Sequence, residues 1–372
     1  MQPGCEEMKS SPTEPAAKLV VGPIERFDQK NCMFKRAGWD PPFQRVRASM
    51  KALRVFKNRD GNSLEDLAFK EAAWYLDHTC GETGSFTSRI PPGSKLEVRN
   101  PAAMSRHVKK AAIFFGASQV GICELDRNWV YSHSYVAGEH TVLELPEEIR
   151  YAIVMVFEMD HELVKYSPTF LADAATGKGY SMIPFTANSL ARYIHGMGYQ
   201  AMPSGNDVAL SIPLAVDSGL GEMGRNGLLI TAEFGPRVIV GKVLTDLPLV
   251  PDRQKRLGVL EFCSQCEKCA KHCPSQAILR GGRTSIPRNI GNSGGVLKWP
   301  IDGERCYGFW GENEEACLTC IRVCPFNKPR GALHKWGKWI VKRLPWLDPF
   351  LLKMDNLLGY GRPGRTKAFW TR

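Results

Sequence analysis

Apolar residues follow a helical period in one part of the chain and form short continuous runs in others. Met104, Val108, Ala111 and Phe115 recur every three or four positions, as on one face of an α-helix. Short apolar runs rich in β-branched residues are typical of buried strands. These patterns predict helices over residues 101–116 and 187–198 and strands over residues 118–123, 151–157, 228–232 and 238–243, the last two joined by the turn EFGP.

The predicted elements divide the chain into four stretches. Residues 1–100 are irregular and then basic, and we expect them to pack on the body that follows. Residues 101–250 hold the predicted helices and strands, so they are expected to form an α/β core. A linker-like stretch leads to a cysteine-rich unit over residues 251–330, and residues 331–372 are basic and rich in tryptophan.

Composition places the chain among soluble globular proteins, with 43% apolar and 23% charged residues. The longest apolar run, residues 152–157, suits a buried strand and is too short to cross a bilayer. The N-terminus shows no basic region followed by an apolar stretch, and adjacent arginines occur nowhere. We therefore expect a cytoplasmic location, or association with the outer face of a membrane if an export signal has been removed.

The net charge of +11 is concentrated near the C-terminus, where residues 325–372 hold eleven Lys/Arg and two Asp. Such a segment can contact nucleic acid, an anionic membrane surface or an acidic redox partner. It can equally form a solvated basic face beside a negatively charged cofactor. Trp336, Trp339 and Trp346 indicate that the segment is folded.

Eight of the twelve cysteines fall between Cys263 and Cys324, which favours metal ligation over disulfides. The first group is a complete C-x2-C-x2-C-x3-C-P motif that ends at Pro274. A second group fits only the last three cysteine positions, and Glu314 stands where the first cysteine is expected. Eight cysteines also suffice for two zinc ions, but the C-x3-C-P endings favour two [4Fe–4S] clusters.

The fourth cysteine of each such motif ligates the other cluster, which assigns the ligands. Cluster two then lacks one ligand, and Glu314 is a poor substitute because a hard carboxylate rarely binds a cubane iron. We expect Cys306 to supply it from the far end of a ten-residue loop. The predicted ligands are Cys263, Cys266, Cys269 and Cys324 for cluster one, and Cys273, Cys306, Cys317 and Cys320 for cluster two.

Motifs in five separate places resemble those of the corrinoid-dependent reductive dehalogenases. They are ERFDQKNCMFKRAGWDP near the start, FGASQVGICELDRNWVYS, the long stretch that begins GYSMIPFTANS, KWPIDGERCYGFW, and MDNLLGYG near the end. The resemblance implies an α+β fold class, with a nitroreductase-like cobalamin-binding core followed by a ferredoxin-like double [4Fe–4S] domain. It also implies a base-off cobalamin. In agreement, the D-x-H-x-x-G ligand motif is absent, because the H-x-x-G strings at His78 and His195 lack the aspartate.

The resemblance also implies the catalytic residues. Tyr180 matches the family's proton-donating tyrosine, and Asn206 matches a residue beside it. The family's usual arginine falls on Ile239, so we expect Arg237, two residues earlier, to take its place. Arg225 is a second candidate.

The cobalamin contacts are expected at one side chain of the GYSM string and at a glycine-dense turn whose backbone can approach the corrin closely. Aromatic side chains from two parts of the chain are expected to line a pocket for an organohalide. The expected cobalamin contacts are Met182, Gly219, Gly221, Arg225 and Gly227, and the expected pocket aromatics are Trp39, Phe43, Trp299 and Tyr307.

The predicted function is reductive removal of halide from a small organohalide, with electrons relayed by the two clusters and a proton from Tyr180. An external donor must supply the electrons, either a ferredoxin- or flavodoxin-like protein or a membrane quinol system, and a small membrane anchor subunit is possible. No nucleic acid is expected. Two alternatives remain open: an epoxyqueuosine reductase-like cobalamin and iron–sulfur enzyme that acts on tRNA, and a non-catalytic iron–sulfur electron-transfer protein.

Overall fold

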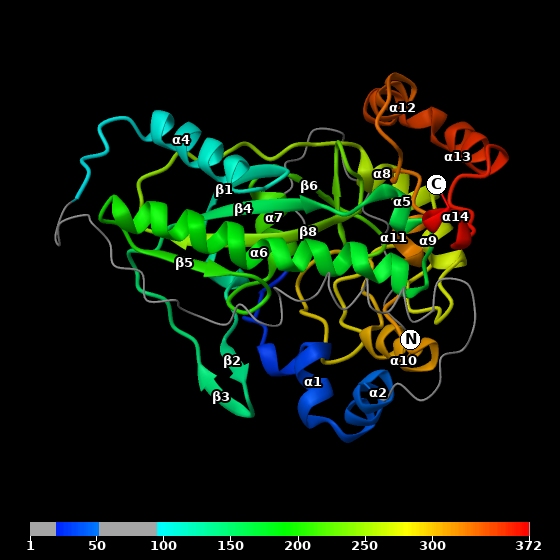
Figure 1. The fold of residues 1–372 in the computed structure, drawn as a ribbon, viewed down its shortest axis with the longest axis horizontal. Helices are drawn as coiled ribbons and strands as arrows, with labels where there is room; N and C mark the ends of the chain where they lie inside the picture. Colours follow the sequence, from blue (N-terminus) through cyan, green and yellow to red (C-terminus); the bar gives the residue numbers. More distant parts are fainter. Residues whose placement is uncertain (1–19, 52–94, 372) are drawn as a thin grey trace, which may run out of the picture.

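The computed structural model describes residues 20–51 and 95–371 (Figure 1). Most of the first predicted domain, including the H-x-x-G string at His78, lies outside these residues. The helices near the start and in the core are η2 (Gln29–Asn31), α1 (Met33–Trp39), α2 (Pro41–Lys51), α4 (Pro101–Phe114), η3 (Arg127–Trp129), α5 (His161–Val164), α6 (Phe170–Gly196) and α7 (Ser211–Asp217). Those of the C-terminal part are α8 (Val259–Gln265), α9 (Lys268–Lys271), α10 (Gly303–Asn313), α11 (Thr319–Arg322), α12 (Ala332–Arg343), η4 (Pro345–Leu347), α13 (Asp348–Leu357) and α14 (Lys367–Trp370).

A four-stranded antiparallel sheet forms the centre of the core, in the order β1-β4-β8-β5. Its strands are β1 (Gln119–Glu124), β4 (Tyr151–Glu158), β5 (Ala201–Ser204) and β8 (Val238–Thr245). Two small antiparallel pairs accompany it, β2 (His133–Val136) with β3 (Glu139–Val142), and β6 (Gly221–Met223) with β7 (Leu229–Thr231).

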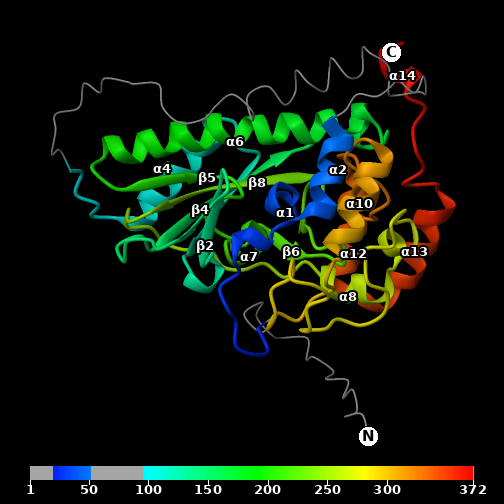
Figure 2. The same ribbon diagram turned by 90° about the horizontal axis from the view of Figure 1, so that it is seen from below.

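Both faces of the central sheet are covered, which explains why β4 reads as one continuous apolar run. Ile153, Met155 and Phe157 face a cluster formed with α4 and α6. Ala152, Val154 and other alternate residues face a second cluster formed with α7 and the loops around it. Figure 2 shows α6 extended along one side of the sheet and α7 on the other.

The predicted helix over residues 187–198 is the second half of a much longer helix, α6 (Phe170–Gly196). The prediction missed its first half because Pro184 lies inside the helix, where proline normally ends or kinks one. Proline has no N–H to offer the carbonyl of Tyr180 four residues earlier. Burial of one whole face holds the helix together across this position.

The elements predicted on either side of EFGP do not form a hairpin. β7 pairs with β6, whereas β8 pairs with β4 and β5 in the central sheet. The predicted loop after Cys306 is also wrong, because residues 303–313 form the helix α10. Asp302 caps its N-terminus by accepting from the Arg305 N–H at 3.1 Å.

Segments far apart in the sequence meet around α10. Both α1 and α2 pack against it, so these two helices of the N-terminal stretch lie beside the cysteine-rich unit (Figure 2). The C-terminal helices α12, which is basic, and α13 lie at an outer corner of the molecule, at the upper right of Figure 1. Among the described residues, none of the helices combines the length and apolarity that a bilayer-spanning segment needs.

Candidate functional site

The eight clustered cysteines divide into two sets of four, and each set lines its own cavity. Cys263, Cys266, Cys269 and Cys324 line a small cavity of about 10 Å³ beneath α8. This is the set that the spacing predicts for cluster one. All four of these side chains are buried, three of them from the first motif and one from the second.

The second set lines a large cavity of about 890 Å³ between the core and the cysteine-rich unit. Its members are Cys273, Cys306, Cys317 and Cys320, as expected for cluster two. Cys306 is the fourth residue of α10. The helix, in place of the expected loop, brings its side chain to the cavity. Glu314 is the left-handed C-cap residue of that helix, with φ 63°, and is not among the residues that line the cavity.

Burial opposes ionisation of these thiols and raises the pKa of Cys263, Cys269 and Cys306 to about 12. The neighbouring cysteines of the same set raise these values further, because several thiolates cannot crowd together without a positive partner. Iron supplies that positive charge and displaces the protons. The donor chemistry and the grouping therefore fit two four-cysteine clusters.

The large cavity extends from the second cysteine set to the core. Its wall on the core side comes from α6, the start of β8 and the loop after β5. The volume lies near the upper end of the range for small-molecule sites. None of the described residues that line it is a histidine.

Tyr180 and Asn206 meet at the core side of this cavity. Tyr180 comes from α6, one turn before Pro184, and Asn206 comes from the loop between β5 and α7. The Asn206 amide donates a hydrogen bond to the Tyr180 hydroxyl at 3.0 Å. A tyrosine with a fixed oxygen thus faces the same space as four cluster cysteines.

Comparison with known proteins assigns the family. The cysteine-rich unit matches a 4Fe-4S double cluster binding domain over residues 262–327. The tetrachloroethene reductive dehalogenase of Sulfurospirillum multivorans is 35% identical in an alignment of 369 positions, and the alignment covers 86% of this chain and 72% of that protein. The chain belongs to the reductive dehalogenase family. This membership confirms the expected α+β fold class and supports the expected cofactors, a cobalamin and two [4Fe–4S] clusters.

Of two further comparisons, the first agrees with this membership and the second shows the same fold. The tetrachloroethene reductive dehalogenase of Dehalobacter restrictus is 35% identical over 312 residues, 73% of this chain and 56% of that protein. The structure of the catabolic reductive dehalogenase NpRdhA has a TM-score of 0.75 at 23% identity, over 93% of this chain. The chain spans about half the length of these two relatives, 56% of one and 49% of the other.

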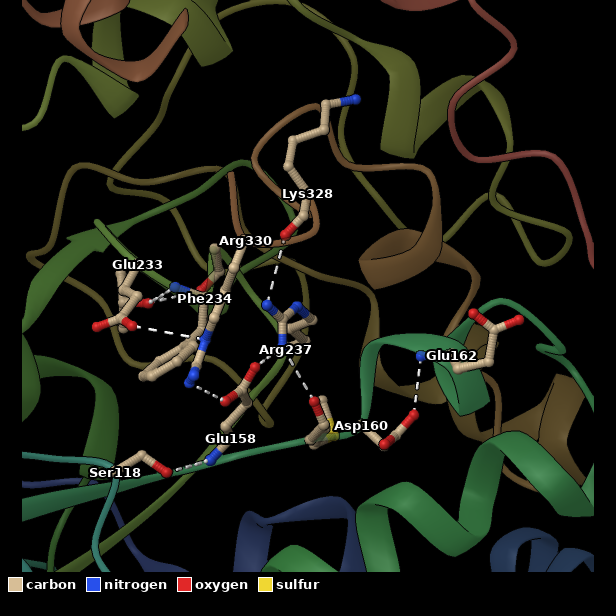
Figure 3. A network of polar contacts seen from close by, with 12 residues as sticks. Ser118, Glu158, Asp160, Glu162, Glu233, Phe234, Arg237, Lys328 and Arg330 are labelled. Atoms are coloured by element: carbon tan, nitrogen blue, oxygen red, sulfur yellow. Dashed lines mark hydrogen bonds and ion pairs between the residues drawn. The ribbon is translucent and has the colours of Figure 1, made fainter. Parts of the chain in front are cut away.

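Arg237, expected beside Tyr180, points elsewhere. Its guanidinium pairs with Glu158 and donates to the carbonyls of Met159 at 3.1 Å and Lys328 at 3.4 Å (Figure 3). The side chain is 1% exposed and does not line the large cavity. The structure therefore does not place Arg237 as the partner of the tyrosine.

Arg225 has a different position again, beside the first cysteine set. Its guanidinium donates to the carbonyls of Cys263, Cys266, Leu279 and Gly281, at 2.7–3.1 Å. It lines the small cavity rather than the large one. One buried cation thus donates to several carbonyl groups of the first cysteine motif, which fixes the shape of that loop. It also places a positive charge beside the first cysteine set.

We expect Arg225→Met to remove this support and to cost about 3–5 kcal/mol of stability, because several buried carbonyls lose their donor. Urea unfolding of the cluster-loaded protein should show the loss, and iron content should fall as cluster one becomes labile. Arg283→Met is the matched control, since Arg283 faces the same Trp299 ring as Arg225. Equal losses in the two variants would contradict this role of Arg225.

Of the other residues expected to contact the cobalamin, only one lines the large cavity. Gly227 lines it, whereas the close approaches of Gly219 and Gly221 are to the carbonyls of Arg253 and Ile230. Met182 packs against the core cluster around α4 and is absent from the cavity lining. All three glycines therefore allow close packing of the chain on itself, at Gly227 against Ile301, and Gly227 alone among them also lines the cavity.

The aromatic side chains of the cavity also differ from those expected. Phe34, Phe309 and Trp310 line it, and none of these was singled out for this role. Of the four that were expected there, Trp39 donates to the Lys30 carbonyl, Phe43 and Tyr307 pack on each other 6.4 Å apart, and Trp299 lies against Arg225. Phe309 and Trp310 follow Cys306 by three and four residues, so in a helix they share its face. This spacing would have predicted them as cavity residues if α10 had been recognised as a helix.

Proposed function

We propose that this chain catalyses reductive dehalogenation, R–X + 2e⁻ + H⁺ → R–H + X⁻, of a small organohalide. The observation that carries the proposal is the shared cavity, in which Tyr180 faces the four cysteines of the second set. Electrons and a proton are the two reactants that this reaction needs besides the organohalide. The proton source, Tyr180, and the cysteines that would hold the electron source line the same cavity. Phe34, Phe309 and Trp310 form an apolar wall beside them.

A cobalamin bound in this cavity supplies the metal centre that exchanges electrons with the carbon–halogen bond. The chain's own residues do the rest. Tyr180 donates the proton to the carbon that loses the halide, and it regains a proton from solvent between turnovers. Asn206 holds the phenol oxygen in place and stabilises the phenolate with its amide N–H. Backbone at Gly227 borders the space that the corrin requires.

The two cysteine sets would hold two clusters that could relay electrons toward the large cavity. Cys269 of the first set packs in one apolar cluster with Cys273 and Cys320 of the second set. The two sets are therefore separated by little more than their own side chains. This packing supports an order in which cluster two would lie between the cavity and cluster one.

An external donor is proposed to dock beside α12 and α13. Asp355 of α13 pairs with Lys268, which lies between two cysteines of the first set, and also with Lys328. The C-terminal segment thus contacts the loop of the first cysteine set, and its basic charge supports docking there of an acidic ferredoxin- or flavodoxin-like donor. A membrane quinol system, a small anchor subunit and the cytoplasmic location remain predictions from the sequence.

The test is anaerobic reconstitution with cobalamin and iron–sulfide, followed by a panel of chlorinated, brominated and fluorinated substrates. We expect halide release from at least one substrate, and none when cobalamin is omitted. A parallel arm offers tRNA that carries epoxyqueuosine. Conversion of the tRNA without halide release from any organohalide would replace this proposal, and a protein that binds no cobalamin would support a pure electron-transfer role.

A further inference from the structure

Lys242 in β8 is a lysine whose side chain is 0% exposed. Its ammonium donates hydrogen bonds to the Gly205 carbonyl and, at 3.1 Å, to Ser211 Oγ. Burial lowers the pKa of Lys242 to about 8, opposed by the nearby carboxylate of Asp207. A buried charge is costly to maintain, and an apolar side chain of similar length avoids that cost. The charge itself therefore calls for an explanation.

A chain of hydrogen bonds leads from this ammonium to Tyr180. Ser211 Oγ accepts from Lys242 and donates to Asn206 Oδ1 at 3.1 Å. The same amide donates through Nδ2 to the Tyr180 hydroxyl at 3.0 Å. An ammonium can only donate, so the Ser211 hydroxyl must donate its own proton elsewhere. Asn206 Oδ1 at 3.1 Å is a nearer acceptor than the Gly205 carbonyl at 3.4 Å, and with this choice every link points toward the phenol oxygen. Hydrogen bonds in such a series polarise one another and strengthen the last one.

We propose that Lys242 is a positioning residue for Tyr180, which acts through Ser211 and Asn206 to stabilise the phenolate that remains when the proton leaves. This inference rests on the proposed function, in which Tyr180 is the proton donor. The relay also fixes which way the Asn206 amide faces, because Ser211 must meet the amide oxygen. It operates below about pH 8 and is lost as pH rises through the pKa of Lys242, since the neutral amine carries no charge.

In this proposal the relay takes over the role of the arginine that the family usually has near the tyrosine. Ile239 stands at that position and lies against Gly179, where an added Cβ would meet Ile239 Cγ1 at 2.5 Å. Arg237 is engaged with Glu158 on another side of the core. Lys242 reaches the same tyrosine from the opposite face of β8, by way of the loop after β5.

Other charged and titratable groups lie near the relay, and their ionisation can also influence the pKa at position 180. Tyr131 donates to the Asn206 carbonyl at 3.3 Å, and burial raises the pKa of Tyr131. Asp207 accepts from Ser204 Oγ at 2.8 Å. Cys32, Lys35 and Asp173 lie on the wall of the same cavity.

The experiment measures the ionisation of position 180 without turnover. We replace the residue by Tyr180→3,5-difluorotyrosine, whose phenol ionises well below tyrosine, and follow it by ¹⁹F NMR in cluster-loaded protein without organohalide. The lower ionisation range brings the titration of position 180 toward the pH values below about 8 at which Lys242 carries its charge. We expect Lys242→Met to raise the pKa at position 180 by about one unit, a tenfold rise in proton affinity. Ser211→Ala keeps the ammonium and its Gly205 contact, so it should give a smaller rise in the same direction.

Ser204→Ala is the matched control, because it alters a neighbouring hydrogen bond of the same loop but no link of the relay. A pKa at position 180 that is equal in Ser211→Ala and in the parent protein would overturn the relay, even if Lys242→Met fails to fold. Because the titration needs no substrate, a shift without any dehalogenation would refute the proposed function alone. Dehalogenation with no shift would refute the relay alone.

Discussion

Tyr180→Phe is expected to lower kcat for dehalogenation by about 10²–10⁴-fold, the usual contribution of a positioned proton donor. Phenylalanine keeps the ring and its packing but has no proton to give. The hydroxyl accepts from Asn206 and opens onto the cavity that holds the second cysteine set. Steady-state halide release by reconstituted protein measures the loss, while cobalamin and iron content should stay unchanged.

Tyr131→Phe is the control for a nearby hydroxyl with no catalytic task. Tyr131 is buried and donates to the Asn206 carbonyl rather than to its amide. We expect its removal to change kcat by less than about tenfold, as for a single neutral hydrogen bond. Full activity in Tyr180→Phe would remove Tyr180 from the mechanism. An equal loss in both variants would mean that the loop geometry, and not the proton, was affected.

Cys306→Ala is expected to cost one of the two clusters, so that iron falls from about eight to about four atoms per chain after reconstitution. Cys306 completes the set formed by Cys273, Cys317 and Cys320 around the large cavity. Dehalogenation should fall below detection, because the cluster that borders the cavity is the one that is lost. Iron and sulfide analysis, together with EPR of the reduced protein, measures cluster content.

Glu314→Gln is the control for the position where a ferredoxin motif has its cysteine. Glu314 ends α10 and lies away from the cavity lining, so its carboxylate should be irrelevant to iron. We expect full iron content in this variant. Retention of both clusters in Cys306→Ala, or loss of one in Glu314→Gln, would show that the ligand assignment is wrong.

The grouping of the cysteines could be predicted from spacing because the ligand geometry of a cubane leaves few choices. The two sets of four around the two cavities are the same sets that the crossover of ferredoxin motifs requires. The way in which Cys306 arrives could not be predicted. The residues after it are polar, aromatic and glycine-containing, and only their packing against α1 and α2 shows that they form a helix.

The positions of the arginines were beyond prediction for a different reason. A strand pattern tells which face a side chain occupies, but not which partner attracts it. Glu158 lies across from the start of β8, at the position paired with Val238, and it binds Arg237 there. Arg225 likewise donates to carbonyls of the cysteine loop, and no local sequence pattern predicts these contacts. Lys242 escaped notice because an isolated lysine in a strand looks like an exposed one.

The most direct test of the proposed reaction is its balance in deuterium oxide, with a reductant of known electron count. We expect one halide and one singly deuterated product for every two electrons consumed, and no reaction when either cobalamin or the clusters are absent. Halide released without consumption of electrons would indicate hydrolysis instead. Electrons consumed without halide would contradict the claim that the two clusters and Tyr180 serve a carbon–halogen bond.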